Sequence, residues 1–538
     1  MKTIIRRTAA SLAAGVIAAG ALAGCGNGGG SQTTGGAAAS TAANSSSTTK
    51  AGESKASSGS RPTVTFSTID FNAGASNTGD NAEKTLDAIK DYTNTDVQIQ
   101  WIPTDTLDEK NSLAMQSPDT MPMIMTWNGA VTGNIVTWAK QGAFVDLSSY
   151  LSDSSKYPNL SKQNAQVAKS LSVNGKQFGI YRARVIGRYG LSYRKDWAEK
   201  LGLSEPKTID DVEAMLKAFT EDDPDGDGQD DTVGMEMTSY TGPFDIMQTW
   251  FGCGNGWTEK DGKLIPVWQQ DEYFTALDWF KKIYDAGYMP SDWATRQTDS
   301  WSDGCKKGQN GVYIDVLDGA TRITDYFQKN DVKSVTNPDE TASMNLIGTI
   351  NGKTMATSGY NGYFTLSAKT CNTPEKVEAA LHFLDKMCDE DMMVLTNYGL
   401  EGINYHMEDG NIVQDDLADK SLSANHNGLN QLVPYIPYTE PQNKTLKKTP
   451  QKKLETEVVK ANSEVAIMNP ALPYLNSSAT YASNGGQLDK DISAARTQYI
   501  CGEIDKDGLN AAIQSAMDKG YSKIIDEVNE AYKADTAK

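Results

Sequence analysis

One short loop holds the residues of this chain that are best suited to chemistry. It covers Asp223–Thr232, reads DPDGDGQDDT, and packs five carboxylates into ten residues. Carboxylates this close repel one another unless the loop is fully hydrated or a cation neutralises it. Glycines follow the second and third aspartates of the loop, and they allow the backbone to curl so that the side chains point inward.

The spacing in this loop matches an oxygen cage for calcium. Calcium loops take side-chain or backbone oxygens from alternate positions. Here those positions are Asp223, Asp225, Asp227, Gln229 and Asp231. Position 12, where an EF-hand places a bidentate glutamate, is Gly234, which argues against a paired EF-hand sensor. The pattern favours a structural calcium site, and an acidic surface turn without metal stays the alternative.

Helices and strands must position this loop. A helical pattern at 208–219 (TIDDVEAMLKAF) precedes it, and a strand-like segment (TVGMEM) follows it. Near the N-terminus the pattern is strand, helix, strand, helix, strand, at residues 63–69, 80–93, 96–102, 105–117 and 122–127. This βαβαβ order predicts a parallel sheet, whose ligands collect where the strands end, at Asp70–Ala73 and Trp127–Gly129.

The first residues predict an exported protein. Met1–Gly24 has a basic start and an apolar stretch, and it ends in Leu-Ala-Gly before Cys25. This ending resembles a bacterial lipobox, which implies cleavage before Cys25 and a diacylglycerol anchor on its sulfur. The protein would then sit on the outer face of the cell membrane. An ordinary secretory signal with an incidental cysteine is the alternative.

A linker rich in Gly, Ser, Thr and Ala follows and covers residues 25–60. It has too few apolar residues to build a core, so we expect a flexible tether that spans roughly 30–35 Å. No later segment has the apolar length of a membrane helix. We therefore expect a globular body outside the membrane.

Charge narrows the range of partners. The signal carries three basic and no acidic residues, so its removal takes the formal net charge from −19 to −22. So acidic a chain is a poor partner for nucleic acid.

The cysteines and histidines give little support to catalysis. Beyond Cys25 there are five cysteines without CxxC spacing, and the one candidate for a disulfide is Cys253 with Cys305. The three histidines lack metal-ligand spacing. Zinc chemistry and histidine-activated nucleophiles are therefore not indicated.

Several longer segments resemble one known family. They are LSYRKDWAEKLGLSEPKTIDDVEAMLKAF with the acidic loop directly after it, YPNL at 157–160, NYGLEGINY at 397–405, and YICGEIDKDGLNAAIQSAMDKGYSKIIDEVNEAY at 499–532. These segments resemble the extracellular solute-binding lipoproteins of ABC importers, family 1, which is associated with carbohydrates. Some alginate-binding relatives hold calcium in the same loop. The family often has an acidic residue at the tenth position of this loop, whereas here it is Thr232, so one carboxylate ligand is missing.

The resemblance implies the fold and the partners. The fold would be α/β with two lobes, each a sheet flanked by helices, and the ligand would bind in a cleft between them. Lobe 1 would comprise residues 61–184 and 315–372, and lobe 2 residues 185–314 and 373–538. The protein would be a monomer that binds a carbohydrate and meets the permease subunits of an importer.

Aromatic residues in polar, glycine-rich loops are the candidates for contact with a sugar, because sugar rings stack on Trp and Tyr. They are Trp127, Tyr240, Trp257, Trp301 and Tyr360. Nearby polar candidates are Asn128, Arg184, Asp315 and Asn361. For each aromatic residue, packing in the core is the competing interpretation. Tyr273, Leu277 and Phe280 recur at helical spacing and indicate packing.

Three classes of function are compatible with these features. The first is a non-enzymatic binding protein that delivers an oligosaccharide to an ABC importer. The second is a lipid-anchored glycoside hydrolase, which would need two carboxylates about 5–10 Å apart. The third is a peptide-binding or sensory lipoprotein on the same fold. The missing catalytic motif and the family resemblance favour the first.

Overall fold

The computed structural model describes residues 61–537, except 118, 120 and 438–443. The signal segment, the linker and Cys25 lie outside the described residues. The described part of the chain belongs to one contact unit that begins at Ser60.

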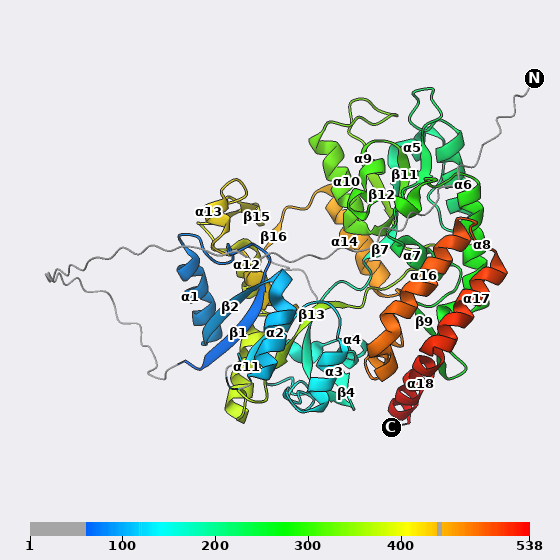
Figure 1. Ribbon diagram of the computed structural model, residues 1–538. Helices are drawn as coiled ribbons and strands as arrows, with labels where there is room; N and C mark the ends of the chain where they lie inside the picture. The colour runs from blue at the N-terminus through cyan, green and yellow to red at the C-terminus, as the bar shows by residue number, and fades with distance from the viewer. Residues whose placement is uncertain (1–60, 118, 120, 438–443, 538) are drawn as a thin grey trace, which may run out of the picture. The chain divides into compact units, whose positions relative to one another are not determined.

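The first sheet has five strands in the order β2-β1-β3-β13-β6 (Figure 1). Their bounds are β1 Thr63–Asp70, β2 Asp96–Pro103, β3 Ile124–Trp127, β6 Gly179–Ala183 and β13 Tyr360–Leu366. β1 pairs in parallel with β2 and β3, which confirms the parallel sheet predicted near the N-terminus. β13 runs antiparallel to β3 and β6, so the carboxyl ends of β1 and β3 and the start of β13 lie at the same edge.

Helices cover this sheet and share its core. They are α1 Ala82–Thr93, α2 Leu107–Gln116, α3 Gly133–Lys140, α4 Ala165–Lys169, α11 Pro374–Lys386 and α12 Glu390–Tyr398. Phe66 of β1 meets Phe364 of β13 and Phe383 of α11 edge to face, with ring centroids 5.3 and 6.0 Å apart. Because Phe383 is completely buried, α11 is part of this core although it lies about 300 residues after β1 in the chain.

The second sheet has four strands in the order β12-β7-β11-β8. Their bounds are β7 Tyr189–Arg194, β8 Val233–Met235, β11 Asn310–Val316 and β12 Met344–Ile347. The helices around it are α5 Lys195–Lys200, α6 Ile209–Glu221, α7 Gly242–Trp250, α8 Asp271–Asp285, α9 Asp303–Lys306, α10 Leu317–Lys329 and α14 Pro450–Ser463. The predicted packing of α8 is confirmed, since Tyr273, Leu277 and Phe280 are buried.

The C-terminal helices complete the second core. They are α15 Leu472–Leu475, α16 Gly486–Ile500, α17 Lys506–Ala516 and α18 Ser522–Thr536. Leu509 and Val528 are fully buried in the same cluster as the strand residues Leu191 and Ile314. The C-terminal helices therefore dock on the second lobe, to which the family resemblance assigned them.

The chain passes between the two sheets at places that differ in part from the prediction. The first passage lies between Ala183 of β6 and Tyr189 of β7. The return lies between β12 and β13, and not at 315, because β12 pairs with β7 of the second sheet. Residues 373–436 likewise do not belong to the second lobe. The α11 residues and Ile436 lie in the core of the first sheet, so the last passage falls between Ile436 and α14.

Small elements complete the described chain. They are the pair β4 Ser172–Val173 and β5 Lys176–Gln177, the hairpin β9 Trp257–Lys260 and β10 Lys263–Pro266, the helix α13 Lys420–Ser423, and the small sheet of β14 Tyr405–Glu408, β15 Asn411–Gln414 and β16 Thr445–Leu446. Among the described residues, the helices are too short or too polar to span a bilayer.

The suggested disulfide between Cys253 and Cys305 does not form. Both residues are free, buried thiols. Cys253 lies in the main core of that lobe, whereas Cys305 lies in a separate cluster under α10.

Candidate functional site

Asp70 ends β1 at the sheet edge where a ligand was predicted. Its carboxylate accepts hydrogen bonds from the backbone N–H groups of Asn72 (2.7 Å) and Gly74 (2.6 Å) and from Ser76 Oγ (2.8 Å). Burial raises the pKa of Asp70, but these hydrogen bonds outweigh burial and leave the pKa below its ordinary value. Through these hydrogen bonds, Asp70 stabilises the loop that follows β1.

Two of the predicted ligand residues at this edge belong to the core. Trp127 is 5% exposed, and its Nε1 donates to Thr365 Oγ1 at 2.8 Å. Tyr360, which begins β13, is also buried. We therefore remove Trp127 and Tyr360 from the ligand-binding set. Their neighbours Asn128 and Asn361 are exposed at the same edge.

Arg182 lies on β6, close to this edge, and was missed by the sequence analysis. It is 2% exposed, and its Nη2 donates to Gln431 Oε1 at 2.6 Å. Its Nε has no hydrogen-bond partner. Burial, followed by the charge of Arg184, lowers the pKa of Arg182 to about 10. Arg184 itself is half-buried, and its backbone N–H donates to Gly359 O at 2.9 Å.

In the second lobe the structure brings together three predicted residues, Tyr240, Trp301 and Asp315. The rings of Tyr240 and Trp301 meet edge to face with centroids 5.5 Å apart. Trp301 Nε1 donates to Asp315 Oδ2 at 2.7 Å. Burial raises the pKa of Asp315, and the hydrogen bond from Trp301 opposes this shift. Tyr240 remains 37% exposed and Trp301 is half-buried, so both rings keep accessible surface beside a buried carboxyl.

Trp257 does not join this cluster. It begins β9, is 3% exposed, and stacks on Tyr521 with ring centroids 6.2 Å apart. It is a core residue of the second lobe, and we remove it from the ligand-binding set.

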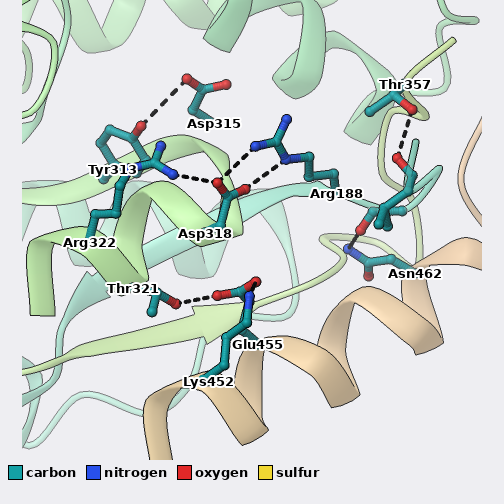
Figure 2. A network of polar contacts seen from close by, with 12 residues as sticks. Arg188, Tyr313, Asp315, Asp318, Thr321, Arg322, Thr357, Lys452, Glu455 and Asn462 are labelled. Atoms are coloured by element: carbon teal, nitrogen blue, oxygen red, sulfur yellow. Dashed lines mark hydrogen bonds and ion pairs between the residues drawn. The ribbon is translucent and has the colours of Figure 1, made fainter. Parts of the chain in front are cut away.

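A polar network lies next to the aromatic cluster (Figure 2). Arg188 donates to Asp318 through Nε at 2.7 Å and through Nη2 at 2.8 Å. Arg322, one turn further along α10, also bonds Asp318. Tyr313 hydroxyl points to Asp315 Oδ2 at 3.5 Å, which places the aromatic cluster beside the arginine pair.

Helix α14 closes the other side of this network. Its Glu455 accepts hydrogen bonds from Thr321 Oγ1 at 2.7 Å and from Lys452 Nζ at 2.5 Å. Asn462, further along the helix, donates to the backbone oxygens of Gly187 and Tyr189. The helix is thereby bonded both to α10 and to the passage between the sheets (Figure 2).

A cavity of about 990 Å³ adjoins this network. Arg184 and Arg188 of the passage line it together with Asp318 of α10 and one face of α14. Asn411 of β15 and the β16 residues line it from the small sheet. The cavity is large enough for a ligand of several sugar rings.

Sequence reasoning missed Arg182, Arg188 and Asp318 for different reasons. The two arginines fall with Arg184 in the seven-residue stretch RARVIGR, and that density of one cationic side chain was an available signal. Asp318 carries no comparable signal, because an acidic residue in the first turn of a helix is common.

The acidic loop is partly arranged as predicted. Carboxylate oxygens of Asp223, Asp225 and Asp227 lie within 4.8 Å of one another. Burial, followed by the charges of Asp227 and Asp231, raises the pKa of Asp225. Asp231 lies outside the three-residue group, and Gln229 donates through Nε2 to Asp227 Oδ2 at 2.6 Å. The three central aspartates therefore fit a hard cation, and the two outer ligands would have to turn inward.

Thr232, at the tenth position of the loop, has a structural partner. It is buried, and its Oγ1 donates to Phe219 O of α6 at 2.9 Å. This bond ties the end of the loop to the helix before it.

The family follows from comparison with known proteins. A sequence model of the bacterial extracellular solute-binding protein family matches residues 75–387. The chain belongs to this family. It is 35% identical over 462 residues to "Lipoprotein LipO" of Bacillus subtilis, a match that covers 84% of this chain and 88% of LipO. It is 29% identical over 461 residues to the "Polygalacturonan/rhamnogalacturonan-binding protein YtcQ" of the same organism, with the same coverage.

Solved structures support the two-lobe solute-binding fold. A Bifidobacterium longum infantis solute-binding protein, described as "HMO binding", superposes with a TM-score of 0.62 at 19% identity, covering 88% of this chain and 99% of that one. The Streptococcus pneumoniae ABC-transporter substrate-binding protein FusA, as an "EF-hand mutant in complex with fructo-nystose", has a TM-score of 0.56 at 18% identity and the same coverage.

Proposed function

We propose that this solute-binding protein captures an oligosaccharide outside the cell and delivers it to the permease of an ABC importer. The observation that carries the proposal is the accessible aromatic pair Tyr240 and Trp301, held beside Asp315 and close to the 990 Å³ cavity. Relatives named for polygalacturonan and for a fructo-oligosaccharide support a carbohydrate ligand.

The geometry suits recognition of a sugar ring. The apolar C–H face of a pyranose stacks on an aromatic ring, and its hydroxyls bond to planar polar groups around the ring. Trp301 offers the ring, and its Nε1 fixes Asp315 at 2.7 Å. Arg188 is oriented by two bonds to Asp318, so its position is set before a ligand arrives. Such preorganisation lowers the ordering cost of binding.

We propose binding without turnover, in keeping with a family of binding proteins. Incubation of the protein with oligosaccharides should return them intact. Release of sugar fragments at a rate proportional to protein concentration would instead support the glycoside hydrolase alternative.

We further propose that Cys25 carries a diacylglycerol anchor and that the protein acts as a monomer on the extracellular face of the cell membrane. Cys25 lies outside the described residues, so the support comes from its sequence context and from a relative that is named a lipoprotein.

Titration calorimetry of the full chain against mono- and oligosaccharides and a peptide library tests the function. We expect saturable binding of an oligosaccharide, with a rise in melting temperature because the ligand binds only the folded state. Binding of peptides in the absence of any carbohydrate binding would contradict the proposal and favour the peptide-binding alternative.

We propose that the acidic loop binds calcium through Asp223, Asp225 and Asp227, with Gln229 and Asp231 as outer ligands. The support is the grouping of the three carboxylates and the EF-hand of the similar protein FusA, which was solved as an EF-hand mutant. Calcium would remove the repulsion between these carboxylates. Its role would be structural, because the loop joins α6 to β8.

Calcium should therefore raise the stability of the protein. At free calcium 100 times the dissociation constant the expected gain is about 2.7 kcal/mol, measured as a rise in melting temperature relative to chelator. The double variant Asp225→Asn with Asp227→Asn should lose this response. The matched control, Asp339→Asn with Glu340→Gln in another exposed loop, should keep it. If wild-type melting does not change on chelation, the loop is an acidic turn without metal.

A further inference from the structure

The 990 Å³ cavity is cationic although the chain as a whole is strongly acidic. Six of its lining side chains are cationic and three are anionic, whereas the formal net charge of the chain is −19. The cationic residues are Arg184, Arg188, Lys448, Lys452, Lys453 and Lys460. The anionic residues are Asp318, Glu455 and Glu464. Positive charge is thus concentrated at the cavity that adjoins the Arg188–Asp318 network.

Two of the three anionic groups are already bonded to cations. Asp318 bonds Arg188 of the cavity and also Arg322, which lies outside the lining. Glu455 bonds Lys452 and Thr321. These carboxylates therefore leave part of the cationic lining without a counter-charge. Lys453 and Lys460 are exposed, and among the described residues neither forms an ion pair.

The position of the lysines is fixed because the opposite side of α14 is anchored. Leu454 and Val458 pack against the cluster under α10. Buried Gln451 donates to Met344 O of β12 at 3.0 Å, and Asn462 bonds the passage between the sheets. The helix thus holds its lysine-bearing face toward the cavity, which Lys452, Lys453 and Lys460 line.

Arg182 extends the positive charge to the edge of the first sheet. Among the described residues no carboxylate pairs with it, although it is 2% exposed. A Cβ added at Gly362 would lie 3.7 Å from Arg182 Nη1 and 2.6 Å from Trp127 O, which places the guanidinium at the end of β3. A buried cation without an anionic partner is costly, and an anion bound nearby would compensate it.

We propose that the ligand is an acidic oligosaccharide whose uronate carboxylates bind the cationic side chains of this cavity while its rings stack on Tyr240 and Trp301. This inference rests on the proposed function and specifies the class of ligand. A guanidinium offers parallel N–H donors that match a carboxylate, and lysine adds a point charge. Lys453 and Lys460 both lie on the exposed face of α14. The cavity can therefore bind an oligosaccharide chain that carries several carboxylates.

The test compares ligands that differ only in charge. Calorimetry measures the binding of the full chain to an oligogalacturonate and to its methyl ester of the same length. The ester keeps the sugar rings but lacks the carboxylate charge. We expect the acid to bind at least about tenfold more tightly than the ester, and we expect this difference to shrink at high salt because ions screen the attraction.

Two matched double variants test whether the lysines of α14 bind the carboxylates of the ligand. Lys453→Gln with Lys460→Gln should weaken binding of the oligogalacturonate about tenfold and leave binding of the ester unchanged. Lys260→Gln with Lys263→Gln removes the same number of exposed charges on the β9–β10 hairpin, away from the cavity, and should alter neither ligand.

The other outcomes separate this inference from the function on which it rests. Equal affinity for acid and ester, or tighter binding of a neutral oligosaccharide, overturns the acidic ligand and leaves the oligosaccharide function standing. Tighter binding of a sulfated oligosaccharide than of the oligogalacturonate overturns the assignment to carboxylates. Failure of every oligosaccharide, charged or neutral, overturns the proposed function itself.

Discussion

Replacing Asp196 by alanine is expected to lower the free energy of unfolding by about 3–5 kcal/mol. Arg194 donates to both carboxylate oxygens of Asp196, at 2.9 and 2.8 Å, and both side chains are only 4% exposed. The guanidinium also lies over the rings of Trp197 and Phe327, 4.8 and 5.1 Å from their centroids. Loss of the carboxylate would leave a buried cation that water cannot reach.

A second contact adds to this loss. Val335 N–H donates to Asp196 Oδ2 at 3.0 Å, so the alanine variant also leaves a backbone donor without its partner. Urea unfolding of wild type and variant measures the difference.

Two controls separate the buried charge from general damage. Arg194→Met with Asp196→Leu removes both charges and should recover most of the stability, because apolar groups replace buried ion pairs at little cost. Asp303→Ala breaks the exposed pair with Lys307 and should cost less than about 1 kcal/mol. A loss for Asp196→Ala no greater than for Asp303→Ala would contradict the argument.

Local pattern was enough to predict the three parallel strands of the first sheet and the helix that carries Tyr273, Leu277 and Phe280. Alternation and helical spacing depend on neighbouring residues alone, and β1, β2, β3 and α8 follow from them. The passages between the lobes depend on pairing across the chain. Three of the four residues of β12 are apolar and would suit either sheet, and only the pairing of β12 with β7 places it in the second lobe.

Only part of the candidate site was predicted from the sequence, for a similar reason. All five candidate aromatics lie in glycine-rich stretches, and the sequence does not tell which of them begin or end a strand. Trp127 ends β3, Trp257 begins β9 and Tyr360 begins β13, and each turns inward. Tyr240 and Trp301 lie outside strands and keep exposed surface. Arg182 lies within a strand and becomes a site candidate only because its burial lacks a compensating charge.

The cavity joins groups that are far apart in sequence. Arg188 lies in the first passage between the sheets, Asp318 lies in the first turn of α10, and the lysines of α14 follow the last passage. Their assembly therefore depends on the chain crossing between the sheets more than once, so segments at each crossing meet around one space. This arrangement explains why the ligand-binding side chains of such a protein are hard to predict from any single segment.

Replacing Trp301 by alanine is expected to weaken oligosaccharide binding by about 10- to 100-fold, because an aromatic ring that covers a sugar face contributes about 1.5–3 kcal/mol. Tyr240→Ala should have a similar effect, since its ring supports Trp301 edge to face at 5.5 Å. Trp301→Phe keeps a ring but loses the bond to Asp315, and it should fall between wild type and Trp301→Ala. Titration calorimetry with the best ligand of the panel measures all three.

Tyr326 provides the matched control for these variants. It is 38% exposed, close to the 37% of Tyr240, and lies on α10 of the same lobe with its ring against Lys306 and Phe327. Tyr326→Ala removes the same side chain from a similar surface and should leave the affinity unchanged. If Tyr240→Ala and Trp301→Ala bind as tightly as Tyr326→Ala while all three keep the wild-type melting temperature, the sugar does not bind at this aromatic pair.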